Sequence, residues 1–271
     1  MKKKWNGNAG WVIKSIACLM MVSQAEAVTV AIDSTASSFI KDPAPGAGNA
    51  AYTHMMSIQN YQAGYNKTTD ETTRNWFIFD IPTIMASESI SSATFKLYMP
   101  IFLPGDPASD AGFGYSSADA SEEFAIFGLS PDASAVISAS DVLDDAGVPD
   151  DSSMFDAYYP FLVGGELYGS VTVEGADNGT FISMSFSSAG LVALNGSTGS
   201  AFMFGGAVVS IDNAPSLDIA EGLFHHTHPY GFGSPSFETA APELILEIIP
   251  EPSSSLLLAV SGLLMMTKRK R

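Results

Sequence analysis

Three of the four histidines stand close together near the carboxy-terminal end of the chain, at His225, His226 and His228. Neutral imidazole nitrogens are common ligands of Zn²⁺ and other transition metals. The run lies beside Pro229 and Gly231, residue types that favour a loop. We therefore expect either a metal-binding loop or an exposed polar loop that precedes the last strand.

A second polar cluster contains Asp141, Asp144, Asp145, Asp150 and Asp151. Carboxylate oxygens are hard ligands that suit Ca²⁺, although this spacing does not match a known calcium loop. We expect a solvated acidic loop here, with Ca²⁺ binding as the alternative. We therefore expect no cofactor, and binding of Zn²⁺ by the histidines or of Ca²⁺ by the aspartates is the alternative.

The adjacent acids Glu122 and Glu123 are the most obvious candidates for paired carboxylates. A glycosidase needs two carboxyl groups that flank the scissile bond. Neighbouring residues of a strand point to opposite faces, so these two make a poor acid/base couple. The sequence also lacks Gly-x-Ser-x-Gly, His-Glu-x-x-His, Gly-x-Gly-x-x-Gly and P-loop motifs. No catalytic residue is predicted.

Aromatic and basic side chains supply two further candidates. Arg74 is the only arginine before the last three residues, and we expect it to pair with Asp80 or a loop carboxylate as a structural clamp, with ligand contact as the alternative. Rings in loops can stack on sugars or pack beneath the loops. Both interpretations stay open for Tyr52, Tyr61, Tyr65, Tyr115, Tyr158, Tyr159 and Tyr230.

Short apolar alternations separated by Gly, Pro, Ser, Asn and Asp must position these groups, and such a pattern predicts strands. In the run 94–99, Phe95, Leu97 and Met99 should face a core and Lys96 solvent. Serines should face solvent in the run 182–186. The predicted strands are 28–32, 76–81, 94–99, 124–129, 171–173, 182–186, 201–209 and 243–248.

Loops are predicted over 41–51 and 104–123, and single short helices over 140–146 and 188–195. The glycine pair within 201–209 predicts a bulge. Many short strands with almost no helix indicate an all-β fold, a β-sandwich of jelly-roll type.

The two ends of the chain carry most of its positive charge. Eight of the twelve Lys and Arg residues lie within 1–27 and 250–271, against two of the twenty-nine Asp and Glu residues. Residues 28–249 therefore hold 4 cations and 27 acids, a formal charge of −23. Affinity for nucleic acid depends on clustered Lys and Arg, so we expect no nucleic-acid partner.

Residues 1–27 have the features of a secretory signal peptide. Lysines lead, an apolar run follows, and Ala25-Glu26-Ala27 is a small-x-small cleavage site, so Val28 should become the new amino terminus. The alternative, a lipoprotein box that ends at Cys18, lacks the expected Leu. The only cysteine is then discarded, and no disulfide framework is expected.

The segment 250–271 has three parts in order: Pro250-Glu251-Pro252, an uncharged run over 253–267, and the basic block Lys268, Arg269, Lys270 and Arg271. Proline fixes its own φ and holds the residue before it extended. A helix over 253–267 would reach about 22 Å, less than a bilayer core of about 30 Å. The basic block should stay in the cytoplasm.

This tail resembles the PEP-CTERM sorting signal of Gram-negative bacteria, in which a Pro-Glu-Pro motif precedes a short hydrophobic helix and a basic cluster. The resemblance implies recognition by an exosortase, removal of the helix and release or attachment outside the inner membrane, in bacteria that make exopolysaccharide. A plain membrane anchor that is never cut is the alternative.

A second resemblance rests on the runs 74–82 and 90–98, which are Arg-Asn-Trp-Phe-Ile-Phe-Asp-Ile-Pro and Ile-Ser-Ser-Ala-Thr-Phe-Lys-Leu-Tyr. They are similar to the Arg-x-x-x-x-Phe-Asp-Leu and Ile-x-x-Ala-x-Leu-x-Leu pattern of DNRLRE-type and carbohydrate-binding-module-like sandwiches. That resemblance implies a jelly-roll fold and an accessory or matrix role.

Three segments are thus expected: signal peptide 1–27, β-sandwich domain 28–249 and sorting signal 250–271. The expected function is a non-enzymatic secreted or cell-surface protein associated with extracellular polysaccharide. Its expected partners are signal peptidase, an exosortase-like membrane protease and the polysaccharide, with an inner-membrane-anchored precursor. The alternatives are a carbohydrate-active lyase or hydrolase on the same scaffold, and a metal-dependent adhesin.

Overall fold

A computed structural model describes residues 27–42, 61–66, 71–99, 112–129, 165–211, 221–226 and 241–251. Strands account for most of these residues, with one α-helix and one 3-10 turn among them. The elements are β1 (Val28–Asp33), β2 (Ala36–Asp42), β3 (Ala63–Asn66), β4 (Glu71–Asp80), β5 (Glu88–Tyr98), β6 (Gly112–Ser116), β7 (Ser121–Gly128), β8 (Leu167–Glu174), η3 (Gly175–Asp177), β9 (Phe181–Ser185), α4 (Ser188–Gly196), β10 (Ala201–Val208), β11 (Glu221–His226) and β12 (Glu243–Pro250).

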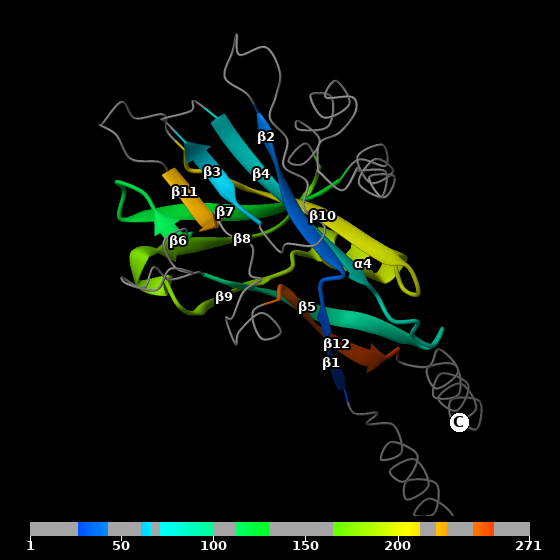
Figure 1. The fold of residues 1–271 in the computed structure, drawn as a ribbon. Helices are drawn as coiled ribbons and strands as arrows, with labels where there is room; N and C mark the ends of the chain where they lie inside the picture. The colour runs from blue at the N-terminus through cyan, green and yellow to red at the C-terminus, as the bar shows by residue number, and fades with distance from the viewer. Residues whose placement is uncertain are drawn as a thin grey trace, which may run out of the picture.

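Two antiparallel sheets face each other (Figure 1). The four-stranded sheet has the order β1-β12-β5-β9, and the eight-stranded sheet has the order β6-β11-β3-β4-β10-β7-β8 with β2 also paired to β4. Trp76 of β4 pairs with Ser38 of β2 and with Gly205 of β10, so these two strands lie on opposite edges of β4. The fold is therefore all-β, with two sheets that share one core.

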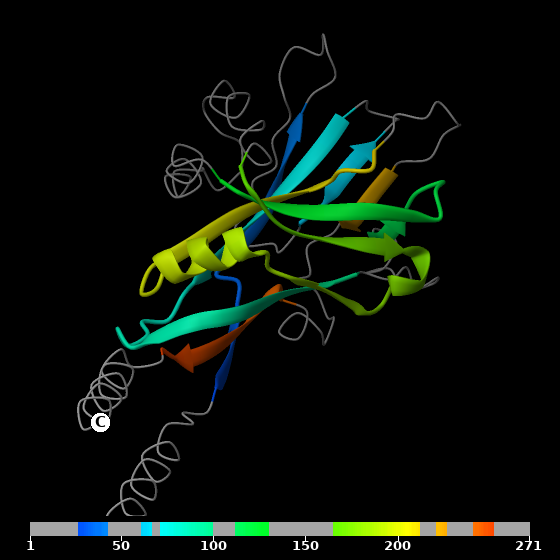
Figure 2. The same cartoon turned by 180° about the vertical axis from the view of Figure 1, so that it is seen from behind.

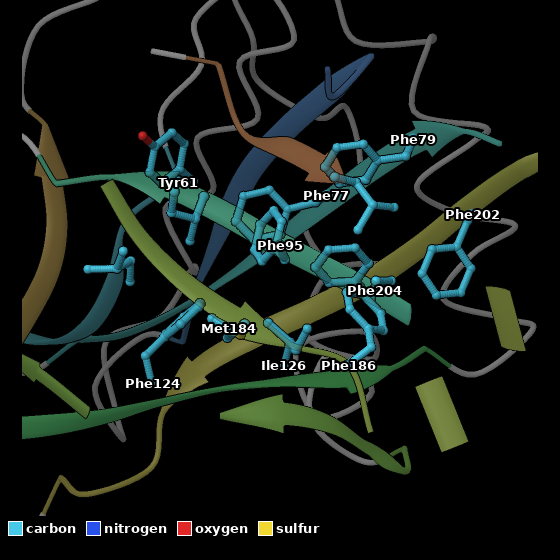
Figure 3. Close-up of a cluster of buried hydrophobic side chains, with 14 of the residues drawn as sticks. Tyr61, Phe77, Phe79, Phe95, Phe124, Ile126, Met184, Phe186, Phe202 and Phe204 are labelled. Atoms are coloured by element: carbon cyan, nitrogen blue, oxygen red, sulfur yellow. The ribbon is translucent and has the colours of Figure 1, made fainter. Parts of the chain in front are cut away.

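Phenylalanine rings fill the space between the sheets (Figure 3). Phe95 of the four-stranded sheet lies 4.9 Å, centroid to centroid, from both Phe77 and Phe204 of the eight-stranded sheet. Phe79 and Phe204 are neighbours on β4 and β10, with centroids 5.8 Å apart. Buried aromatic surface is the largest apolar contribution that single side chains make to a core. These contacts across the sheets hold them together.

Helix α4 lies at the side of the two sheets, between the levels of β10 and β5 (Figure 2). It begins where the Ser187 side chain accepts a hydrogen bond from the Gly190 N–H, which satisfies one of the free donors of the first turn. The Asn195 side chain accepts from the Ile90 N–H at 2.8 Å and donates to the Ile90 carbonyl at 2.9 Å. Asn195 thereby fastens the helix to β5.

The structure has a strand at each of the eight predicted positions, although β4 and β5 begin five and six residues before the predicted starts, and the helix predicted over 188–195 is α4. Phe95, Leu97 and Met99 are fully buried, as the alternation predicts, and Ser183 and Ser185 are exposed. The helix predicted over 140–146 lies outside the described residues.

The bulge prediction is wrong, and two loop predictions are wrong in the part that the structure describes. Strand β6 and the first residues of β7 lie within the predicted loop 104–123. Residues 41 and 42 of the predicted loop 41–51 belong to β2, and residues 43–51 lie outside the described residues. The register runs through Gly205 and Gly206 without a shift. The real reason for glycine at 206 is space, because a Cβ there would lie 2.6 Å from Cζ of Phe124 and closer still to Oδ1 of Asn75.

Candidate functional site

The side chains of β5 alternate between the core and the opposite side of the four-stranded sheet. Ala93, Phe95 and Leu97 are buried, whereas Lys96 and Tyr98 between and after them are partly exposed. Successive strand residues point to opposite faces, so a second set of side chains forms the surface that we call the outer face. It consists of Ser92, Thr94, Lys96 and Tyr98 of β5, Phe181, Ser183 and Ser185 of β9, and Glu243, Ile245 and Glu247 of β12.

The register places these residues in rows across the sheet. Lys96 of β5 lies between Glu243 of β12 and Ser183 of β9. Tyr98 lies opposite Phe181 in the neighbouring row. Residues that face each other in an antiparallel pair have their Cβ atoms about 5 Å apart, so each row can act as one contact surface.

An aromatic pair forms one end of the outer face. The rings of Tyr98 and Phe181 have centroids 5.3 Å apart at an interplanar angle of 61°. Phe181 is 40% exposed, although large apolar side chains are usually buried. The backbone carbonyl of Tyr98 accepts a hydrogen bond of 2.9 Å from the hydroxyl of the buried Tyr61, which fixes this end of β5 to the core.

Lys96 joins the aromatic pair to the acidic side of the outer face. Its Nζ lies 5.1 Å from the centroid of the Phe181 ring and 2.6 Å from Oε2 of Glu243. A cation near the face of a ring is attracted by the ring quadrupole. The ammonium group is thereby held beside the ring, with 30% of the Lys96 side chain exposed.

Hydroxyl groups occupy the other end of the outer face. The Ser92 hydroxyl donates to Oε2 of Glu247 at 2.9 Å, and the Ser91 hydroxyl donates to the Glu247 carbonyl at 3.2 Å. Ser183 and Ser185 are exposed on β9. Serine hydroxyls both donate and accept hydrogen bonds. The outer face therefore combines an accessible ring surface with donors and acceptors on a rigid sheet.

The carboxylate pair is separated by the strand, as predicted. Glu122 is buried, with 1% exposure, and Glu123 is exposed. The hydroxyl of Ser117 donates to Oε1 of Glu122 at 2.5 Å, and the hydroxyl of Ser210 donates to Oε2. Both oxygens of Glu122 are thus occupied by side chains that tie β7 to the loops around it. The Glu122 carboxylate therefore has a structural role.

Tyr115 lies in the same region, and it is one of the tyrosines considered for sugar stacking. Its hydroxyl donates to the Asp119 carbonyl at 2.7 Å. Burial raises the pKa of the Tyr115 hydroxyl above its ordinary value, and the nearby carboxylates of Glu122, Asp119 and Glu174 act in the same direction. The hydroxyl is therefore neutral at physiological pH and acts as a donor within the loop.

The other predicted tyrosines divide between the core and the part of the chain outside the described residues. Tyr61 is 3% exposed, with its ring centroid 5.9 Å from that of Phe77 and 5.4 Å from that of Phe224, so it is a core residue. Tyr65 is partly buried on β3. The remaining four, Tyr52, Tyr158, Tyr159 and Tyr230, lie outside the described residues.

The predicted loop around the histidines is corrected in part. His225 and His226 are the last residues of strand β11, where they pair with Phe113 and Gly112 of β6. His228 and the aspartates of 141–151 lie outside the described residues. Among the residues that are described, no three His, Cys, Asp or Glu side chains gather as they would around a metal ion. Metal binding by His225, His226 and His228 stays a prediction.

The prediction that Arg74 pairs directly with Asp80 is wrong. Both residues belong to β4, six positions apart, and a strand rises about 3.3 Å per residue, so about 20 Å separates them along it. Their side chains point to the same face but do not meet. Asp80 is exposed at the end of the strand, whereas Arg74 is partly buried. Pairing of Arg74 with a loop carboxylate, and its alternative of contact with a ligand, stay predictions.

The predicted processing sites begin and end the described fold. Ala27 and Val28 lie at the start of β1, and Pro250 and Glu251 lie at the end of β12. Ala25, Pro252, the run 253–267 and the basic residues 268–271 lie outside the described residues. Within the described ranges no helix is long and apolar enough to span a membrane.

No protein-family model matches the chain, and no curated protein matches it.

Tyr98 and Phe181 are the site residues that the sequence did not single out. The sequence did indicate that each of them faces outward, because residues two apart on a strand share a face. Tyr98 stands two positions after the outward Lys96, and Phe181 stands two positions before the outward Ser183. Their proximity had no local signal, since it depends on the pairing of β5 with β9.

Proposed function

We propose that this chain is an exported, non-enzymatic β-sandwich protein of jelly-roll type that associates with extracellular polysaccharide through its outer face. The observation that carries the proposal is the exposed ring of Phe181, with the partly exposed Tyr98 and Lys96 beside it, on a sheet that bears hydroxyl groups. Rings with apolar faces and polar neighbours suit the alternating CH and OH surfaces of a sugar. The sequence features of both ends support export, with a membrane-anchored precursor and a mature form at the cell surface or in the matrix.

Charge indicates what kind of polysaccharide fits the outer face. Its only cation, Lys96, is already paired with Glu243, and Glu247 adds an exposed carboxylate. The region 28–249 carries a formal charge of −23 as well. Polymers of uronic acids would meet repulsion at such a surface. A neutral glycan is the ligand class that the outer face favours.

The contribution of Phe181 to binding can be calculated from its exposure of 40%. An aromatic side chain presents about 200 Å², so a sugar ring could cover about 80 Å², worth at most about 2 kcal/mol at about 25 cal/mol per Å². Since a factor of ten in Kd corresponds to about 1.4 kcal/mol, Phe181→Ala should weaken binding up to about thirtyfold.

The test is a binding titration of the mature protein, starting at Val28, against neutral and acidic soluble polysaccharides. Phe181→Ala should lose affinity for the neutral polymer, whereas Leu167→Ala should keep it, because Leu167 is an apolar residue of similar exposure, 48%, on β8 of the other sheet. Equal binding by both variants would refute the assignment to the outer face. Binding to none of the neutral polymers would count against the function itself.

An enzyme on the same scaffold makes a different prediction. Incubation of the polysaccharides with the mature protein should release no new reducing ends and no unsaturated ends. Release of either product would favour the lyase or hydrolase alternative.

A further inference from the structure

The end of β12 lies beside the turn that joins β4 to β5, residues 81–87. Pro250 pairs with Glu88 of β5, and the backbone N–H of Glu251 donates to the Ser87 carbonyl at 2.6 Å. In Figure 2 the teal turn and the end of β12 lie together at one end of the two sheets. The described fold therefore ends directly against this turn.

Backbone hydrogen bonds hold the turn in one shape. The Glu88 N–H donates to the Met85 carbonyl, and the Met85 N–H donates to Oε2 of Glu88, both at 2.9 Å. The Ile81 N–H donates to the Ser200 carbonyl, and the Ile81 carbonyl accepts from the Gly199 N–H, both at 3.0 Å. The turn thereby keeps the Met85 side chain outside the core, and this residue is 65% exposed.

Exposed apolar side chains gather around this point. The run 81–87 is Ile-Pro-Thr-Ile-Met-Ala-Ser and has no charged side chain, although the region 28–249 has a formal charge of −23. Besides Met85, Val28 at the start of β1 is 55% exposed and Ile249 at the end of β12 is 36% exposed. We call the run 81–87 with Val28 and Ile249 the apolar end. Grouped apolar side chains on a surface mark a site of contact.

The length of the tail indicates what lies against the apolar end. The uncharged run 253–267 begins two residues after Glu251, and two extended residues reach at most about 7 Å. A helix over 253–267 would span about 22 Å, which is about 8 Å less than a hydrocarbon core of about 30 Å. If the basic block 268–271 stays at the cytoplasmic headgroups, the connection ends at the level of the outer headgroups. Glu251 and the turn beside it are then drawn onto the membrane surface.

We infer that the apolar end rests on the lipid headgroups of the membrane that holds the tail, with the Met85 side chain inserted among them. The inference rests on the proposed function, in which the precursor is anchored by its tail. Methionine is unbranched and flexible, so it can fill irregular apolar spaces. An apolar element at the surface of a bilayer binds by burying its side chains at the boundary between headgroups and acyl chains.

Charge indicates which lipids suit this contact. Carboxylates flank the turn: Asp80 precedes it, Glu88 follows it, and Glu251 is exposed at the end of β12. Anionic lipids would repel these groups and the acidic body behind them. Zwitterionic headgroups are therefore the surface that the apolar end fits.

Contact at the apolar end also sets where the outer face lies in the anchored precursor. Strand β5 begins at Glu88 and ends at Tyr98, and ten strand residues span about 33 Å. The Tyr98–Phe181 pair would thus be held far from the membrane, where a polysaccharide can reach it before the tail is cut.

The test uses the full chain with Cys18→Ser, in phosphatidylcholine vesicles whose headgroups carry a nitroxide on part of the lipid. One cysteine is introduced by Met85→Cys or by Val209→Cys and labelled with the fluorophore nitrobenzoxadiazole. Val209 is the matched control, because it is 46% exposed and lies nine positions beyond Ser200, about 30 Å along β10. We expect the nitroxide to quench the label at position 85 and to leave the label at position 209 unchanged.

Flotation of the vesicles separates two failures. A chain that does not float with them has no anchor, which would refute the membrane-anchored precursor and the inference together. A chain that floats with both labels quenched equally, or with neither quenched, would overturn the inference alone.

A longer connection tests whether the tail sets the contact. A flexible Gly/Ser linker of about ten residues between Glu251 and Pro252 spans about 17 Å, so the label at position 85 should lose most of its quenching. Quenching that the linker leaves unchanged would show that the label binds lipid by itself, and would overturn the inference.

Discussion

Replacement of Phe204 by alanine tests whether the aromatic cluster holds the two sheets together. Phe204 lies on β10 and is fully buried. Its ring centroid is 5.5 Å from that of Phe77 on the same sheet, 4.9 Å from that of Phe95 on the other sheet, and 5.7 Å from that of Phe186 at the start of the α4 region. The substitution would therefore leave a cavity where three parts of the core meet.

The expected loss follows from the size of that cavity. A buried Phe→Ala change costs about 3–5 kcal/mol, and we expect about 4 kcal/mol here. Domains of this kind unfold with about 5–15 kcal/mol, so most of the stability could be lost. For a chain of this length, each 1 kcal/mol lowers Tm by about 2–4 °C, and the expected decrease in Tm is about 8–16 °C.

The assay is thermal and urea unfolding of the segment 28–249, followed by circular dichroism. Phe181→Ala is the matched control, because the same side chain is removed from an exposed position and the expected loss is under about 1 kcal/mol. A decrease in Tm of less than about 3 °C for Phe204→Ala, which corresponds to about 1 kcal/mol, would refute the idea that this ring joins the sheets.

Three further predictions concern the same fold. Burial raises the pKa of the Tyr168 hydroxyl, so above about pH 10 the unfolded chain loses that proton first, and the free energy of unfolding should fall with pH; Tyr168→Phe should make this fall less steep in urea titrations. Asn195→Ala should cost about 1–3 kcal/mol, because it leaves the Ile90 N–H and carbonyl without their side-chain partner; Asn195→Asp keeps only the acceptor and should restore part of the stability. Gly206→Ala should cost about 1–3 kcal/mol by forcing a Cβ against the Phe124 ring, whereas Gly196→Ala, which has open space around it, should cost nothing and serves as its control in the same melts.

Alternation along single strands was enough to predict which side chains face the core. In β5, the order Phe95, Lys96, Leu97 correctly separates buried from exposed positions. The strands that were missed lack this signal. Strand β6 contains Gly112 and Gly114, which favour a loop in the sequence. Strand β2 contains two serines and ends in Lys41 and Asp42, so it lacks a clear apolar alternation. Their backbone groups are used by neighbouring strands, which no local pattern reports.

Only part of the candidate site could be predicted from the sequence. Its outward positions follow from alternation, but Tyr98 and Phe181 become one surface through the pairing of β5 with β9. The same holds for Glu122, whose burial depends on the hydroxyls of Ser117 and Ser210 from two different loops. Tertiary pairing decides such features, and strand propensity contains no information about it.

The pairing of β1 with β12 also has a kinetic consequence. The first strand in the chain has to wait for the last one before it can pair, and closing so long a loop is slow. Until β12 arrives, β1 is a bare edge and β5 has only one neighbour in its sheet. Truncated products that stop before residue 243 would therefore keep unpaired strands in the four-stranded sheet, which a quality-control protease can recognise.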